Sequence, residues 1–474
     1  MGAEDPGRNI EGEQPDIEPT VETDEATVTE SAELERTLGL TGGLAIGIGT
    51  MIGAGIFVFP GLAGAEVGTA ATASFAVGGV IALLVALPTS ELATAMPKSG
   101  GGYYFISRGL GTLAGTIVGL SLWLGLVFAT AFYLVGLGYY ALDAIAEVGI
   151  AIGLADGLLV SILAVLFGIG FTVLNVTGTE NAAKLQNGIV ALLLSMLVAF
   201  LAFGMLDAFG VVDTETPPGE AADVWEVVPI MSVAALVFTS YLGFAQVATV
   251  AGEMKDPGRN LPLAMIGSVV IVTVMYVLTI FVATNVFTQD ALEAAGETAM
   301  VEVGRQLLGT GGALVIILGG LLATMSSANA SILSTSRAIY GVSKDALLPS
   351  WAERINLKYG TPHVALGMAG GPVIVLAATR QVALLAEVAS FLHLIMYGLI
   401  CVALLALRRD EPEWYDPEFR VPGGPVIPAI GAVASFGLIL FMDPVSIGVG
   451  IVVVLATAGW YFYYARDVKL RGVL

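Results

Sequence analysis

Five glycines and one proline interrupt an uncharged stretch of the chain that is long enough to cross a membrane. The stretch reads GIGTMIGAGIFVFPG, from Gly47 to Gly61, and no charged residue occurs between Arg36 and Glu66. Glycine and proline weaken a helix, and main-chain groups released inside a bilayer are costly unless a partner takes them up. The pattern therefore predicts a broken membrane helix whose freed main-chain groups bind a ligand.

A second interruption occurs in the sixth predicted span, which reads LVFTSYLGFAQVATVAGEMKDPGRNLP with the loop after it; Ser240, Tyr241 and Gly243 lie near the middle of its apolar run. A helix that restarts after a break presents bare N–H groups and the positive end of its dipole, which suit a carboxylate. Freed carbonyl groups and the C-terminal end of a half-helix suit a cation such as an ammonium. A GxG pattern alone would fit a packing face equally well, but two breaks together predict a site for an α-amino acid.

The composition is that of a polytopic membrane protein. The 474 residues are 56% hydrophobic and 12% charged, with a mean hydropathy of +0.86, whereas soluble domains average about 25% charged residues. A single cysteine, Cys401, excludes an intramolecular disulfide and argues against a thiolate metal cluster. Two histidines, His363 and His393, leave little for metal or acid–base chemistry. We expect no cofactor and no enzymatic activity.

Uncharged stretches of roughly 20 residues predict twelve membrane spans. They cover residues 40–62, 69–96, 112–142, 157–177, 188–207, 228–252, 262–288, 307–340, 364–379, 382–407, 425–442 and 444–464. If the N-terminus is cytoplasmic, seventeen of the nineteen lysines and arginines fall on the cytoplasmic side, all but Arg305 and Arg380. The positive-inside rule therefore predicts a multi-pass protein of the plasma membrane with both termini in the cytoplasm.

Spans 1 and 6 are the equivalent first helices of two five-helix halves, residues 39–207 and 208–407. Because five is odd, the second half enters the membrane from the opposite side, and the halves form an inverted repeat. Two trailing helices occupy residues 408–466, and a short cytoplasmic C-terminus occupies residues 467–474. Residues 1–38 are rich in acids and predict a disordered cytoplasmic tail. Such acidity suits a salt-loving source such as a halophilic archaeon, although an ordinary acidic tail explains it equally well.

Four motifs together resemble the amino acid–polyamine–organocation transporters, over residues 40 to 470. They are GIGTMIGAGIFVFPG, SELATAMPKSGGGYYF, YLGFAQVATVAGEMKDPGRNLP and SANASILSTSRAIYGVSKDALLP. The resemblance implies an all-α polytopic fold with two inverted five-helix repeats and two further helices, working by alternating access. By position it implies a substrate site at the main chain of Met51, Ile52, Gly53, Ala54, Gly55, Thr239, Ser240, Tyr241, Leu242 and Gly243.

Two departures from the family pattern bear on the gate and on the coupling ion. The family often has an aromatic lid four residues before the sixth-helix glycine; here that residue is Thr239, which leaves Phe238 as the gate candidate. Many proton-coupled members carry a lysine midway along the fifth helix, where this chain has Leu193. Sodium coupling, proton coupling and exchange therefore stay open, and hydroxyls of Ser326 and Ser327 on span 8 are candidate sodium ligands.

Two titratable side chains within the spans are candidates for proton coupling or gating. Glu91 in span 2 is a functional candidate because an intramembrane carboxylate is costly. It lies one turn from the PKSGG loop, so gating or helix–loop packing is favoured over proton carriage. His393 in span 10 could titrate, although a lone histidine among apolar neighbours is more often a packing residue.

The leading hypothesis is a secondary transporter of amino acids that contacts the lipid bilayer, with a polyamine or other organic amine transporter, or a sensor on the same fold, as alternatives. A major facilitator would show six-plus-six symmetry and a basic loop after span 2. An intramembrane enzyme lacks a catalytic set, and a channel would not need two half-broken helices. No GxxxxGK[ST] loop occurs, so we expect neither nucleotide nor nucleic acid as a partner. The sequence does not reveal the oligomeric state.

Overall fold

The computed structural model describes residue 36 and residues 38–97, 101–177, 182–212, 225–356 and 361–468. These residues form helices and one isolated bridge between Leu38 and Met254, with no β-strand among them. The α-helices are α1 (Leu40–Met51), α2 (Gly55–Val67), α3 (Ala71–Ala95), α4 (Gly101–Leu110), α5 (Thr112–Glu147), α6 (Asp156–Thr177), α7 (Ala182–Ala208), α8 (Val227–Val237), α9 (Gln246–Thr249), α10 (Pro257–Val286), α11 (Gln289–Ala295), α12 (Ala299–Lys344), α13 (His363–Ala377), α14 (Val382–Asp410), α15 (Val426–Ile439) and α16 (Pro444–Trp460). The all-α polytopic fold class is confirmed.

Every predicted span falls on one of these helices or on a consecutive pair of them. Among the described residues, nine helical stretches are long and apolar enough to cross a membrane, and α1, α13 and α15 are shorter apolar helices. The count of twelve crossings, the repeat and the domain boundaries therefore stay predictions. The predicted tail lies outside the described residues except for Arg36 and Leu38, and so do residues 469–474.

The first span is broken where the glycines predict it. Helix α1 ends at Met51, and α2 begins at Gly55 with Ala54 as its N-cap. Between them, Ile52 adopts a non-helical ψ of 89°, and the Gly53 amide turns back to the Met51 carbonyl at 2.9 Å. Alanine has no side chain that could cap the first amides of α2, so the N-terminal end of α2 presents bare N–H groups.

The sixth span is interrupted in a different way. Helix α8 stops at Val237, and a 3₁₀ helix follows over Phe238–Ala245 before the short α9. A 3₁₀ stretch of eight residues is longer than the usual three or four, and such a stretch inside a helix often marks strain or a hinge. The interruption is therefore a tightened helix, where the sequence suggested an open break.

Spans 1 and 6 run antiparallel and meet at the start of the described chain. The Leu38 amide donates to the Glu253 carbonyl at 2.9 Å, and the Lys255 amide donates to the Leu38 carbonyl at 2.7 Å. These bonds tie the residues just before α1 to the residues just after span 6. Gly43 of α1 faces the Met254 side chain so closely that a Cβ would lie 2.8 Å from its methyl carbon.

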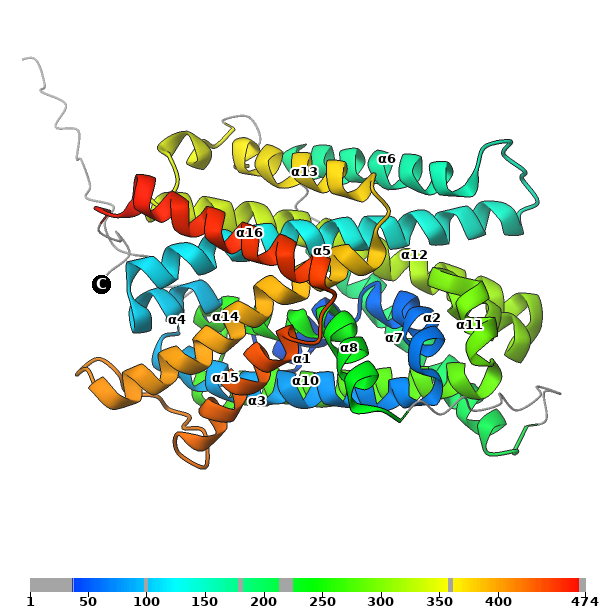
Figure 1. The fold of residues 1–474 in the computed structure, drawn as a ribbon, viewed down its shortest axis with the longest axis horizontal. Helices are drawn as coiled ribbons and strands as arrows, with labels where there is room; N and C mark the ends of the chain where they lie inside the picture. Colours follow the sequence, from blue (N-terminus) through cyan, green and yellow to red (C-terminus); the bar gives the residue numbers. More distant parts are fainter. Residues whose placement is uncertain are drawn as a thin grey trace, which may run out of the picture. The chain divides into compact units, whose positions relative to one another are not determined.

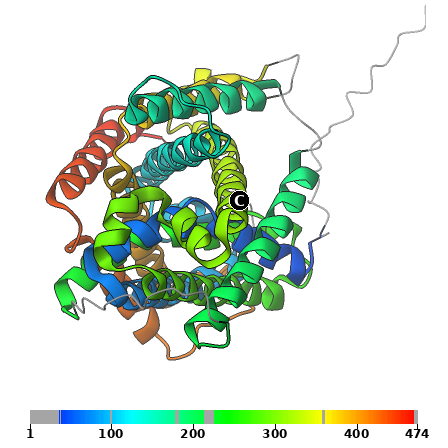
Figure 2. The same ribbon diagram turned by 90° about the vertical axis from the view of Figure 1, so that its right-hand side faces the viewer.

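The remaining long helices surround this pair. Helices α3 and α10 pack against each other, and α10 also packs against α1, while α5 lies between α12 and α14 (Figure 1). Figure 2 shows several of these helices end-on, so they run in roughly one common direction. Two short helices outside the predicted spans, α4 and α11, follow spans 2 and 7. The Tyr103 hydroxyl fixes α4 by donating to Asp345 at 2.7 Å.

Candidate functional site

The two interruptions touch each other through their main chains. Oγ1 of Thr50 lies 2.7 Å from the Ile46 carbonyl of its own helix and 2.9 Å from the Gly243 carbonyl of span 6, so its one proton can serve either acceptor. A Cβ atom at Gly243 would lie 2.5 Å from the Met51 nitrogen, so only a residue without a side chain allows this approach. The two stretches that the sequence predicts to bind substrate are thus brought together.

Glycines on the first break face serine hydroxyls on the neighbouring helices. A Cβ atom at Gly53 would lie 2.5 Å from Oγ of Ser327 on α12, and one at Gly55 would overlap Oγ of Ser240. Met51, Ile52, Gly53, Ala54 and Gly55 are all buried. The break is therefore enclosed by span 6 on one side and span 8 on the other.

Buried tyrosines take up the carbonyl groups that the interruptions release. The Tyr276 hydroxyl of α10 donates to the Met51 carbonyl at 2.8 Å, and the Tyr397 hydroxyl of α14 donates to the Leu242 carbonyl at 2.9 Å. The sequence did not single out either residue. The available signal was a tyrosine within an apolar run, since a buried phenol hydroxyl normally needs a hydrogen-bond partner.

A cavity of about 190 Å³ lies beside the interruptions. Its wall comes from α1, α5, α7, the 3₁₀ segment, α9, α12 and α14. The lining residues are Ala45, Ile46, Gly49, Thr50, Leu126, Ala129, Tyr133, Val190, Leu242, Gly243, Gln246, Ser327, Ala330, Ser331, Ser334 and His393. Four of the residues predicted from the sequence, Leu242, Gly243, Ser327 and His393, thus line it.

The cavity occupies one side of the two breaks. Its residues from span 1 all precede the break, and its residues from span 6 lie at Leu242 or beyond. Because the two spans run antiparallel, these halves lie on the same side. On the other side, Phe59 of α2 stacks on Phe132 of α5, with ring centroids 5.0 Å apart. The cavity thus lies on the α1 side of the breaks, and stacked aromatic rings lie on the α2 side.

The described wall of the cavity contains no aspartate, glutamate, lysine or arginine. Its polar groups are hydroxyls, the Gln246 amide and the His393 imidazole. The Nδ1 atom of His393 lies 2.8 Å from the Ala389 carbonyl, which fixes the proton on Nδ1 in the neutral ring. Such a wall suits a ligand whose side chain is uncharged.

Other predicted residues lie outside the cavity wall. Phe238 is fully buried, with its ring 6.2 Å from those of Tyr241 and Tyr397. Thr239 donates to the Ala386 carbonyl of α14 at 3.1 Å, and Tyr241 donates to the Phe75 carbonyl of α3 at 2.7 Å. Ser326 is buried on α12, next to Ser327. The gate and ion-site assignments stay predictions.

Glu91 lies in a separate network away from the cavity. Its carboxylate accepts from the Arg408 guanidinium of α14 through both oxygens and from the Tyr415 hydroxyl at 2.8 Å. The Val421 amide donates to it at 2.6 Å. Burial and the hydrogen bond to Glu91 raise the pKa of Tyr415, so its hydroxyl remains a donor. The network joins helix to loop; the sequence ranked gating or helix–loop packing above proton carriage for Glu91, and this assignment stays a prediction.

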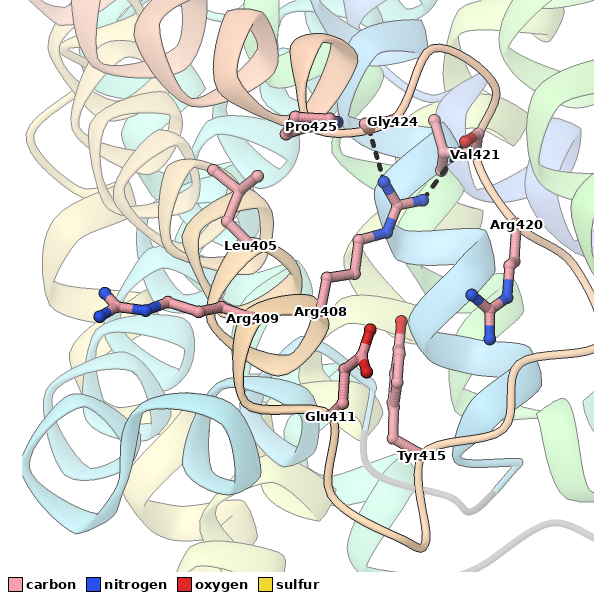
Figure 3. A pocket seen from close by; sticks show the side chains of 9 residues that line it. All are labelled: Leu405, Arg408, Arg409, Glu411, Tyr415, Arg420, Val421, Gly424 and Pro425. Atoms are coloured by element: carbon pink, nitrogen blue, oxygen red, sulfur yellow. Dashed lines mark hydrogen bonds between the residues drawn. The ribbon is translucent and has the colours of Figure 1, made fainter.

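A second cavity, of about 630 Å³, opens beside this network (Figure 3). Its wall comes from the end of α14 and from the loop that leads to α15. Figure 3 shows the Arg408 side chain reaching toward Val421 and Gly424, while Arg409 points away from them. Although larger, this cavity does not touch either interrupted helix, so we do not assign the substrate to it.

The fold and the site define a polytopic membrane protein in which two antiparallel, interrupted helices meet beside a cavity. The sequence profile of the amino acid permease family matches residues 38–465, and the chain belongs to this family. A branched-chain amino acid permease of Bacillus subtilis is 29% identical over 452 residues, covering 93% of this chain and 95% of the relative. A serine/threonine exchanger of the same organism is 27% identical over 447 residues, covering 92% and 98%. A methylthioribose transporter of B. subtilis is 27% identical over 417 residues, covering 85% and 88%.

Proposed function

We propose that the protein is a secondary transporter of amino acids with uncharged side chains. The carrying observation is the contact between Gly243 and the end of α1, beside a cavity whose described wall holds no charged residue. The bare amides of α2 suit the substrate carboxylate, and the carbonyls at the end of α1 suit the ammonium. The Bacillus branched-chain permease and serine/threonine exchanger are named for uncharged substrates, which supports the same class.

The orientation and the coupling belong to this proposal. Both termini lie in the cytoplasm of a plasma-membrane protein, so the cavity lies on the cytoplasmic side of the breaks. Substrate is exchanged between the two sides by alternating access, with sodium, a proton or a second amino acid supplying the coupling. Ser326 and Ser327 are the proposed sodium ligands, and Ser327 supports this by facing Gly53 at the break.

Uptake of radiolabelled amino acids into proteoliposomes tests the proposal. The panel includes branched, hydroxylated, acidic and basic amino acids, and each is measured with an imposed sodium gradient, with a proton gradient, or with preloaded amino acid. Concentrative uptake of uncharged amino acids in any of the three conditions supports the proposal. Uptake restricted to basic amino acids or polyamines would contradict the substrate class, and no uptake would favour a sensor.

The three gradient conditions also separate the coupling mechanisms. Uptake with sodium alone supports an ion site near span 8, whereas uptake with a proton gradient alone makes His393 and Glu91 the next residues to vary. Uptake into preloaded vesicles alone identifies an exchanger.

A further inference from the structure

The second cavity, of about 630 Å³, has a wall rich in arginine. Arg408, Arg409 and Arg420 line it, and Glu411 is the acidic residue among its lining residues. The volume lies within the usual range of small-molecule sites, about 300–1,000 Å³. Such a wall stands out on a chain whose formal net charge is −21. The cavity therefore favours an anionic ligand.

The three arginines differ in what they can still bind. Arg408 is occupied, because its guanidinium donates to the Glu91 carboxylate and to two carbonyls of the loop before α15. Arg409 comes from the end of α14 and Arg420 from that loop (Figure 3). Both are exposed, and within the described part of the chain neither forms an ion pair. They can turn toward a ligand without breaking an existing pair.

Two guanidinium groups point to a phosphate as the anion. The planar guanidinium matches the geometry of phosphate oxygens and donates two hydrogen bonds at once. Glu411 supplies one opposing charge, so Arg409 and Arg420 together leave one positive charge for the ligand. A phosphodiester carries one negative charge and fits this balance.

The cavity lies at the level where lipid headgroups are expected. It follows span 10, whose helix α14 ends at Asp410. Trp414 is 48% exposed beside it, with its ring 6.1 Å from that of Tyr415 in the cavity wall. Tryptophan and tyrosine are enriched at the interface between membrane and water. A phospholipid headgroup could therefore enter the cavity from the membrane.

An exposed apolar face begins directly beside the cavity. Pro425 lines the cavity and is the N-cap of α15. Val426, Ile430 and Val433 of that helix are exposed, and their spacing places them on one face. In a membrane such a face contacts acyl chains. A phospholipid can occupy both the cavity and this face, whereas a free phosphate would use the cavity alone.

We propose that this cavity binds the headgroup of an anionic phospholipid. Arg409 and Arg420 donate to its phosphate, and its acyl chains lie along α15. The ion pair of Arg408 with Glu91 holds the end of α14 against the loop, and so keeps the two donors around one space. The site is separate from the cavity beside the broken helices and goes beyond the transport function proposed above.

Lipid binding to the detergent-purified full-length protein tests the proposal. Phosphatidylglycerol and phosphatidylcholine with the same acyl chains are titrated in, and the first bound lipid is quantified by native mass spectrometry. We expect phosphatidylglycerol to bind at least about fivefold more tightly, as for one arginine near an anionic headgroup. Equal affinity for the two lipids would overturn the proposal.

Two soluble anions separate a lipid from a free phosphate. Glycerophosphoglycerol has the headgroup of phosphatidylglycerol without acyl chains, and inorganic phosphate has the anion alone. We expect neither to displace phosphatidylglycerol at equal concentration, because neither contacts the face of α15. Full displacement by either one would overturn the assignment of the site to a lipid.

Arg409→Gln and Arg420→Gln each remove one donor from the cavity. We expect each to weaken phosphatidylglycerol binding about fivefold and to leave phosphatidylcholine binding unchanged. Arg466→Gln is the matched control, since Arg466 is an exposed arginine at the end of span 12 and does not line the cavity. We expect the native affinity from it. An equal loss in Arg466→Gln, or no loss in either cavity variant, would overturn the proposal.

Glu411→Gln keeps the proposal testable if an arginine variant does not fold. It removes the negative charge from the wall, so we expect phosphatidylglycerol to bind about fivefold more tightly. Misfolding cannot produce a gain in affinity. An affinity that is unchanged or lower in Glu411→Gln would overturn the proposal.

The two proposals can fail separately, because lipid binding is measured without a transported substrate. If the native protein binds phosphatidylglycerol as expected and transports no amino acid, the proposed function alone fails. If it transports amino acids and binds both lipids equally, the lipid site alone is overturned.

Discussion

Gly55 lies directly against the Ser240 hydroxyl, so the first residue of α2 touches the middle of the interrupted sixth span. A Cβ atom at Gly55 would overlap Ser240 Oγ and would lie 3.0 Å from Ser240 Cβ and 3.3 Å from the Phe59 ring. The overlap with Oγ is thus the severe one, while the other two contacts are tight but close to tolerable. The start of α2 can consequently approach span 6 this closely only because residue 55 has no side chain.

The contact predicts a compensating pair of substitutions. Gly55→Ala should strongly reduce uptake, because the new methyl group collides with the Ser240 hydroxyl and displaces α2. Ser240→Ala removes that hydroxyl, so the double variant should regain part of the lost transport. A double-mutant cycle on uptake rates measures this coupling. Additive effects of the two substitutions would show that the contact does not govern the site.

A larger side chain tests the same position without compensation. Gly55→Val should abolish uptake and leave folded protein in the membrane, because a branched side chain collides with Ser240 and pushes the start of α2 away from span 6. Size-exclusion chromatography of the detergent-solubilised variant checks its folding. Normal transport by a folded Gly55→Val protein would remove the first break from the proposed substrate site.

Gly243→Ala tests the main-chain contact between the two spans. Its Cβ would lie 2.5 Å from the Met51 nitrogen and 2.5 Å from the Thr50 carbonyl carbon, and these backbone atoms cannot rotate away. Overpacking of this kind typically costs about 1–3 kcal/mol, so we expect a lower melting temperature and loss of transport. Gly367→Ala on α13 is the control, because a Cβ there meets no heavy atom within 4 Å. Equal melting temperatures for the two variants would contradict the prediction.

The break in span 1 could be predicted from the sequence because glycine acts locally. Gly53 and Gly55 weaken the helix through their own backbone freedom, whatever residues pack against them. In span 6, the residue types from Phe238 to Ala245 fit an open loop or a tightened helix equally well. Packing against Met51 and Tyr397 decides between these forms, and this packing depends on contacts far apart in the sequence.

The partners of buried polar groups could not be predicted for the same reason. Glu91 stood out as an intramembrane acid, but its partner Arg408 lies 317 residues further along the chain. Tyr276 lay in an apolar run with nothing nearby to indicate that its hydroxyl reaches Met51. A polar residue in an apolar run can be recognised from the sequence as needing a partner. The tertiary arrangement of the helices decides which partner it finds.

Loss of the Glu91 network is expected to lower the melting temperature and to change ion coupling little. Glu91→Ala leaves the Arg408 guanidinium without its carboxylate. Loss of one partner of a buried ion pair costs about 3–5 kcal/mol of folding stability. Because the Arg408 side chain is 20% exposed, we expect the lower end of this range. The measurement is the melting temperature in detergent. If Glu91 carried the coupled proton instead, Glu91→Gln would abolish proton-driven uptake and spare exchange, at a nearly native melting temperature.

Thiol labelling can locate the cavity relative to the membrane. Ser334 lines the cavity and is partly exposed, whereas the native Cys401 is buried and should not react. Ser334→Cys should react with a membrane-impermeant maleimide in inside-out vesicles and not in right-side-out vesicles, because the cavity is proposed to lie on the cytoplasmic side of the breaks. A transported amino acid should slow the reaction, since it fills the same space.

Native protein in both kinds of vesicle gives the background from Cys401. Reaction confined to right-side-out vesicles would reverse the proposed orientation, and a rate that no amino acid changes would separate this cavity from the substrate path.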